Sequence, residues 1–297
     1  MNLGYAVELI VAGISGHSQN LSGHSGSLAR TISLVDSEVK TIQSIPDAPN
    51  DLPNATQVNQ AIHNYHDAVN GWEAARNKLT NTLTLISELS KGASMIDVIP
   101  DPLLTVDNIK MGLGIALDTV NQLNKQIQNA LADIQQLENT VDASYRDNAT
   151  ALQGTSDEVS RQEQQLNDQV QSLKNQIEDM DSAKSIFLGV LTCGIHTIAN
   201  INDIQNQIAD CQEKEVKLHY YRQLYDQANS MILSCSGAIK TASISLSNIS
   251  TVLQQYINEF DDMRSSNSQS LVVMKAYLKT FKNEALRAGE EISNALN

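Results

Sequence analysis

The sequence predicts an all-α fold, an elongated bundle of long antiparallel helices with a short apolar head between the two longest helices. Three observations support this fold class. All five prolines lie between residues 46 and 102, so the whole of 103–297 contains none. Apolar residues recur every seven positions on both sides of the stretch 185–202, as in packed helices. That stretch, SIFLGVLTCGIHTIANIN, contains no Asp, Glu, Lys or Arg, although charged residues make up 18% of the chain.

The N-terminal third predicts shorter helices. Residues 1–26 begin apolar and end in GISGHSQNLSGHSG, whose glycines predict a flexible joint after at most a short helix. From Ser27 a helical period appears, and it ends at Pro46 because proline interrupts a helix. A second helix is expected from about Val58 to Leu89, at three- and four-residue spacing, and it is closed by Gly92 and the prolines that follow.

Two long helical arms follow, expected over 103–181 and 203–264. The first carries a seam with a seven-residue spacing: Tyr145, Leu152, Val159, Leu166, Leu173 and Met180, with Val141, Val170 and Ile177 at part of the second seam position. The second arm repeats it: Ile204, Cys211, Leu218, Tyr225, Ile232, Ile239, Leu246, Leu253 and Phe260, with the companion track Tyr221, Ala228, Cys235, Ala242, Ile249 and Tyr256. One helix cannot bury such a seam alone, so the arms should pack antiparallel, with the earlier helices completing a bundle.

The chain therefore divides into three predicted parts. Residues 1–102 with 265–297, which include a last amphipathic helix from Leu271, form a helical tail bundle. Residues 103–184 and 203–264 form the coiled-coil arms, and 185–202 form the hydrophobic head.

Composition excludes several functions. The formal net charge of −14 opposes nucleic-acid binding, which depends on clustered Lys and Arg. Cys193, Cys211 and Cys235 are too few and too widely spaced for a disulfide framework or a zinc site, and are interpreted as small apolar fillers. The apolar N-terminus lacks a basic region and contains Glu8, so it is a poor secretory signal. The chain is expected to be made as a soluble protein, and any export would need another route.

Neither an enzyme nor a cofactor or metal site is predicted. The sequence contains no nucleophile elbow, HExxH motif or phosphate-binding loop, and Gly112 and Gly114 do not follow a strand. His63 and His66, with Asp67, could share a helix face and bind a metal, but a solvated polar face is the favoured interpretation. His196 lies in the apolar stretch, where it is either a satisfied buried histidine or a pH-sensitive switch.

Three interpretations of 185–202 remain open on composition. It could be a connector covered by the rest of the chain, a contact surface for a partner protein, or an element that inserts into a membrane. Gly189 and Gly194 permit a hairpin, whereas a single helix would span about 27 Å, slightly less than the hydrocarbon core of a bilayer. An exposed apolar tip would promote aggregation, so in water it must be covered or shared.

The layout of long helix, charge-free head, long returning helix and shorter flanking helices resembles the cytolysin A-type α-helical pore-forming toxins, including multi-component haemolysin, enterotoxin and XaxAB/YaxAB-type cytotoxins. The resemblance implies a soluble subunit that exposes its head at a target membrane and assembles into a ring with copies of itself and with partner subunits. It assigns membrane insertion to eight residues: Ile186, Phe187, Leu188, Val190, Leu191, Ile195, Ile198 and Ile201. The head is short for a single-component toxin, which favours a component of a multi-subunit one.

The alternative function is an intracellular coiled-coil scaffold whose apolar tip docks a partner protein. It predicts a stable dimer or larger assembly in plain buffer and no response to detergent. The toxin interpretation predicts a monomer that forms large rings when detergent is added.

Overall fold

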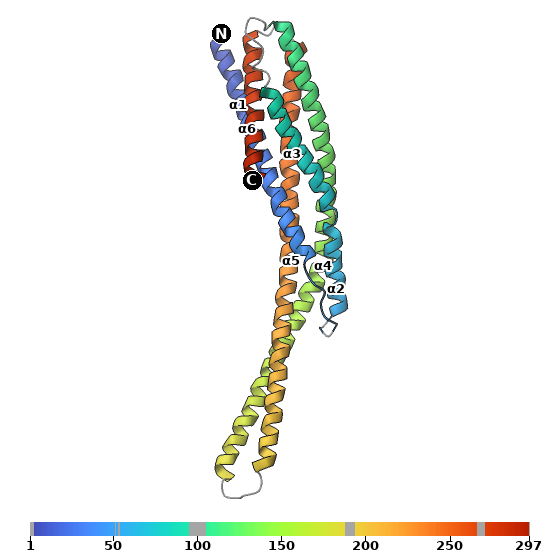
Figure 1. The fold of residues 1–297 in the computed structure, drawn as a ribbon, viewed down its shortest axis with the longest axis vertical. Helices are drawn as coiled ribbons and strands as arrows, with labels where there is room; N and C mark the ends of the chain where they lie inside the picture. Colours follow the sequence, from blue (N-terminus) through green and yellow to red (C-terminus); the bar gives the residue numbers. More distant parts are fainter. Residues whose placement is uncertain are drawn as a thin grey trace. The chain divides into compact units, whose positions relative to one another are not determined.

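Every secondary-structure element in the described part of the chain is an α-helix (Figure 1). The computed structural model describes residues 3–50, 52, 54–94, 105–187, 194–265 and 271–296, with side chains described within 21–50, 52, 54–89, 105–179, 203–265 and 271–296. The helices are α1 (Leu3–Gln43), α2 (Ala55–Val69), α3 (Trp72–Ser94), α4 (Val106–Phe187), α5 (Gly194–Ser265) and α6 (Leu271–Leu296). The predicted all-α class is confirmed.

The described helices belong to two compact units. The first contains 1–41, 67–142 and 233–297, and the second contains 42–66 and 143–232. Both α4 and α5 contribute to each unit. Residues 106–142 of α4 and 233–265 of α5 belong to the first unit, and the rest of each helix belongs to the second.

α1 is one continuous helix of 41 residues, so the flexible joint expected before Ser27 is wrong. The glycines lower helix propensity by about 1 kcal/mol each, but the segment has no proline to break the hydrogen-bond ladder. Tertiary packing compensates for the helix propensity lost at the glycines, since Leu21 and Leu28 of α1 are fully buried. Gly26 also has a packing role, because a Cβ there would lie 3.1 Å from Oε2 of Glu291 on α6.

The helix expected from about Val58 to Leu89 is two helices, because the chain breaks at Asn70 and Gly71. The backbone N–H of Asn70 donates to the carbonyl of Asp67 at 3.2 Å, which closes α2 with a tighter turn. A Cβ on Gly71 would come within 3.3 Å of Leu137 Cδ1 on α4, so the missing side chain permits a close approach. The Asn-Gly pair is a turn signal that the apolar period concealed.

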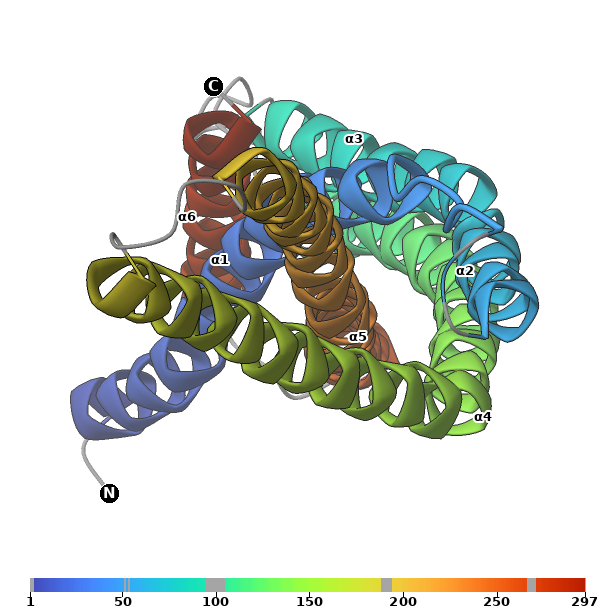
Figure 2. The ribbon, with the colours of Figure 1, turned by 90° about the horizontal axis from the view of Figure 1, so that it is seen from below.

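Helices α1, α3, α4, α5 and α6 pack together in the first unit (Figures 1 and 2). Trp72 Nε1 of α3 donates to Asp36 Oδ1 of α1 at 2.7 Å, and Arg76 pairs with the other oxygen of the same carboxylate at 2.9 Å. Four aromatic rings join α5 to α6. They are Tyr256, Phe260, Tyr277 and Phe281, and Phe260 is fully buried.

The seam between α4 and α5 in the first unit contains a polar layer among its apolar residues. Ser250 Oγ donates to Asn124 Oδ1 at 2.6 Å, and Asn124 Nδ2 donates to Gln254 Oε1 at 3.2 Å. The side chain of Gln128 donates to Ser250. Asn124 and Ser250 are both buried, so these bonds satisfy polar groups that would otherwise be costly to remove from water.

In the second unit α2 packs against α4 and α5. The Tyr65 hydroxyl donates to Asn229 Oδ1 on α5 at 2.8 Å, and Asn64 Nδ2 donates to Asn148 Oδ1 on α4 at 2.9 Å. The seam positions predicted for α5 are buried along both units, from Ile204 to Phe260. In α4 the predicted seam is less completely covered, since Leu166 is only half-buried.

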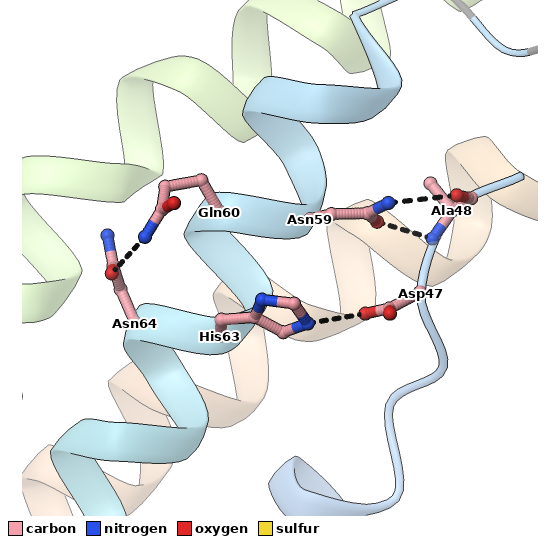
Figure 3. Close-up of polar contacts among 6 residues, drawn as sticks. All are labelled: Asp47, Ala48, Asn59, Gln60, His63 and Asn64. Atoms are coloured by element: carbon pink, nitrogen blue, oxygen red, sulfur yellow. Dashed lines mark hydrogen bonds and ion pairs between the residues drawn. The ribbon is translucent and has the colours of Figure 1, made fainter. Parts of the chain in front are cut away.

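The proline-containing segment after α1 is fixed to α2 (Figure 3). Asn59 of α2 makes two backbone bonds to Ala48, accepting from its N–H at 2.6 Å and donating to its carbonyl at 3.0 Å. Asn54, directly before α2, has a φ of 54°, a conformation that asparagine tolerates better than most residues with a side chain.

Cys235 makes the stability of the first unit sensitive to alkaline pH. The side chain is fully buried on α5, and burial together with the Glu38 carboxylate raises the pKa of the thiol to about 12. The unfolded thiol ionises near pKa 8.5, so the folded chain holds this proton more tightly. The stabilisation is complete below about pH 8.5 and is lost as the pH rises toward 12.

We therefore expect the free energy of unfolding of the unmodified chain to fall more steeply between about pH 9 and 11 than that of Cys235→Ala. Urea unfolding followed by circular dichroism at several pH values measures both slopes. The comparison between the two proteins removes the contribution of tyrosines that titrate in the same range. Equal slopes would contradict the assignment.

Candidate functional site

The apolar head predicted from the sequence lies at the ends of the two longest helices. Ile186 and Phe187 are the last residues of α4, and Ile195, Ile198 and Ile201 lie in the first turns of α5, although their side chains are outside the described part of the structure. Leu188, Val190 and Leu191 lie outside the described residues altogether. The role of all eight predicted head residues in membrane insertion therefore stays a prediction.

The second unit shows that α4 and α5 run antiparallel as they approach these ends. Ser156 Oγ donates to Asp226 Oδ1 at 2.8 Å, and seven residues further along α4 Glu163 accepts a bond from Arg222 Nη1 at 3.1 Å. Both pairs are placed nearly symmetrically about residues 188–193, as expected when one helix returns alongside the other. The packing of these helices therefore brings Phe187 and Gly194, one at each helix end, to the same end of the pair.

The charged contacts between α4 and α5 in the second unit centre on Glu163, which pairs with Arg222 and His219. The Glu163 side chain is 13% exposed, and its carboxylate also lies 3.2 Å from Nδ1 of His219. Val170, Leu173 and Ile204 are buried nearer the head. Toward the charge-free stretch, the side chains described in the seam are therefore apolar.

His63 and His66 lie near each other on α2, and His63 pairs with a carboxylate of the segment after α1. His63 Nε2 contacts Asp47 Oδ1 at 2.9 Å (Figure 3), and the two imidazole centroids are 6.3 Å apart. Within the described ranges no three His, Cys, Asp or Glu residues are grouped as metal ligands would be. The His63–Asp47 pair is more than half exposed on both sides, so it holds the segment after α1 against α2 only weakly.

No helix among the described residues has the length and apolar character needed to cross a bilayer. The side chain of His196, the candidate pH switch, is not among those described.

Sequence reasoning missed a groove between α3 and α4 in the first unit. Leu89, Leu123 and Phe281 form its apolar floor, and Ile115 stands on its wall with 64% of its surface exposed. Helical periodicity assigns core residues one helix at a time. It could not show that Phe281 of α6 would line a groove between α3 and α4. No signal in the sequence connects these residues, because they come from three different helices.

No protein-family model matches the chain, and no curated protein matches it in sequence. Solved structures match it over nearly its whole length. Soluble SmhB of the tripartite alpha-pore forming toxin Smh from Serratia marcescens aligns with 94% of this chain and 93% of its own, with a TM-score of 0.65 and 9% identity.

Two assembled forms match as well. The SmhB pore aligns with 92% of this chain and 98% of its own, with a TM-score of 0.65 and 10% identity. The pre-pore AhlB of the tripartite toxin AHL from Aeromonas hydrophila aligns with 94% of this chain and 98% of its own, with a TM-score of 0.61 and 13% identity. At these identities the likeness shows a shared fold, and it confirms the predicted resemblance to α-helical pore-forming toxins at that level.

Proposed function

We propose that this chain is a subunit of an α-helical pore-forming cytotoxin or haemolysin that acts with partner subunits. The observation that carries the proposal is the match, over nearly the full length of both chains, to toxin subunits in soluble and pore forms. The charge-free stretch between the two longest helices supports it independently. A scaffold held together only by heptad seams does not need such an apolar segment between its helices.

In this proposal residues 185–202 are the head that enters the target membrane. Eight apolar side chains, at about 1.5–3 kcal/mol each, would provide a strong anchor once buried in lipid. The arms 103–184 and 203–264 would pack against neighbouring subunits, and 1–102 with 265–297 would form the tail. The partners are target-cell lipid, further copies of the chain and other toxin subunits. The protein would be secreted in soluble form.

Gel filtration with and without a mild detergent tests the proposal. We expect a monomer in plain buffer and a large assembly after detergent is added, with ring-shaped particles visible by negative-stain electron microscopy. The detergent stands in for the membrane that exposes the head.

The intracellular scaffold with a docking tip predicts the opposite pattern. A dimer or larger assembly in plain buffer that does not change with detergent would contradict the toxin function. A matched chain that carries charged residues in the head, described in the Discussion, separates head-driven assembly from unfolding by detergent.

A further inference from the structure

The groove between α3 and α4 has the features of a binding site for a single alkyl chain. Its volume is about 270 Å³, slightly below the usual range for small-molecule pockets in proteins. It is lined by side chains of α3 and α4 and by Phe281 of α6, with Leu89, Leu123 and Phe281 at its buried floor. The buried floor is apolar, and the polar side chains stand around it.

The charge described at the groove has one sign. Among the described side chains that line it, which exclude those of residues 90–104, Glu88 is the charged one and no Lys, Arg or His contributes. Glu88 is exposed, so its carboxylate is available to a ligand. The Thr119 hydroxyl is directed to the carbonyl of Ile115 at 2.9 Å. Gln122 and Gln126 add neutral amides.

We propose that this groove binds an amphiphile that carries one alkyl chain and a cationic ammonium head group. The chain would lie over Leu89, Leu123 and Phe281, where it displaces water from apolar surface. The head group would lie beside the Glu88 carboxylate, with the amides of Gln122 and Gln126 nearby. This site shares no residue with the predicted head at 185–202 and does not depend on the proposed toxin function.

Charge and size select this occupant over others. An anionic amphiphile would bring its head group against Glu88 on a chain whose net charge is already −14. A partner helix needs a long apolar groove, whereas this one is confined to the last turns of α3 and the first third of α4.

Gly112 provides a way to fill the groove without disturbing the fold. A Cβ built on Gly112 meets nothing within 4 Å, so the side chain of Gly112→Leu has room in the groove. Gly237 on α5 is the matched control. It is exposed, lies in the same unit, and a Cβ there also meets nothing within 4 Å. Both substitutions replace a helical glycine by a better helix former, so both should keep the helical circular dichroism of the parent chain.

Isothermal titration of the full chain with decyltrimethylammonium, below its micelle threshold, is the direct test. We expect saturable binding at one site, retained by Gly237→Leu and lost by Gly112→Leu. Octyl- and hexyltrimethylammonium should bind progressively more weakly, by about fourfold for each methylene removed. Glu88→Gln should weaken binding of the decyl cation by roughly two- to fivefold, as for an exposed ion pair.

Each contrary result would overturn the proposal. Absence of saturable binding of decyltrimethylammonium would show that the groove is not a binding site for this class of amphiphile. Equal affinity of Gly112→Leu and the parent chain would place the amphiphile elsewhere on the protein. Equal affinity for decyl sulfate would show that Glu88 does not select the head group.

Discussion

Replacing Leu188 and Leu191 together by aspartate should abolish membrane binding while the helical content stays unchanged. Each leucine contributes about 1.5–3 kcal/mol when it is transferred to lipid, and a carboxylate in the hydrocarbon adds a further cost. The loss of affinity for liposomes should therefore reach at least about a thousandfold. Co-sedimentation with liposomes measures binding by this subunit alone. Circular dichroism checks that the helices are retained.

The control for this prediction carries the same charge change on the outer surface of α5. Val216 and Tyr220 are 71% and 55% exposed, and they lie four residues apart on one face of the helix. Val216→Asp with Tyr220→Asp should bind liposomes as the parent chain does. Undiminished liposome binding or leakage by the Leu188→Asp, Leu191→Asp variant would rule out insertion through the head.

Phe260→Ala should give the largest loss of stability among substitutions in the first unit. The ring is fully buried, and its centroid lies 5.0 Å from Phe281 and 5.8 Å from Tyr277, both at nearly perpendicular angles. Removing a buried phenylalanine ring costs about 3–5 kcal/mol, and the edge-to-face pairs with α6 are lost as well. Urea unfolding should show this decrease, and limited proteolysis should cleave α6 more rapidly.

Phe260→Leu provides the matched comparison because it keeps most of the apolar volume. Its cost should be clearly smaller than that of Phe260→Ala. If Phe260→Ala lowered the free energy of unfolding by less than about 1 kcal/mol, or left α6 equally resistant to protease, the aromatic cluster would not be what holds α6 to α5.

The long helices could be predicted from the sequence because their information is local and repeated. In α5 the seven-residue spacing identified the buried positions from Ile204 to Phe260, and burial follows directly from packing such a seam. No proline contradicts the pattern anywhere in 103–297. The fold class followed from these two properties.

The two errors in the predicted helices have different causes: tertiary contacts override local preference in α1, and a local turn signal was missed between α2 and α3. Four glycines between residues 13 and 26 predicted a joint, yet α1 continues because it packs against its neighbours, with Gly26 allowing the approach of Glu291. The break at Asn70 and Gly71 was missed because apolar residues keep a helical period across it.

The two candidate sites differ in how well the sequence could predict them. The head was identifiable as a lack of charge in one contiguous stretch, although its side-chain roles rest on resemblance. The α3–α4 groove was not identifiable, since it joins Leu89, Leu123 and Phe281 from three helices. No single periodicity connects those positions.

The polar layer formed by Asn124, Ser250 and Gln254 restricts how α4 and α5 can move past each other in the first unit. Axial sliding of one helix by a heptad would return apolar residues to apolar neighbours, but it would separate these donors from their acceptors inside the bundle. Their burial makes such a slip costly. Register is therefore locked along this part of the pair, and a rearrangement that keeps the layer intact must bend the helices beyond it or swing them as one piece.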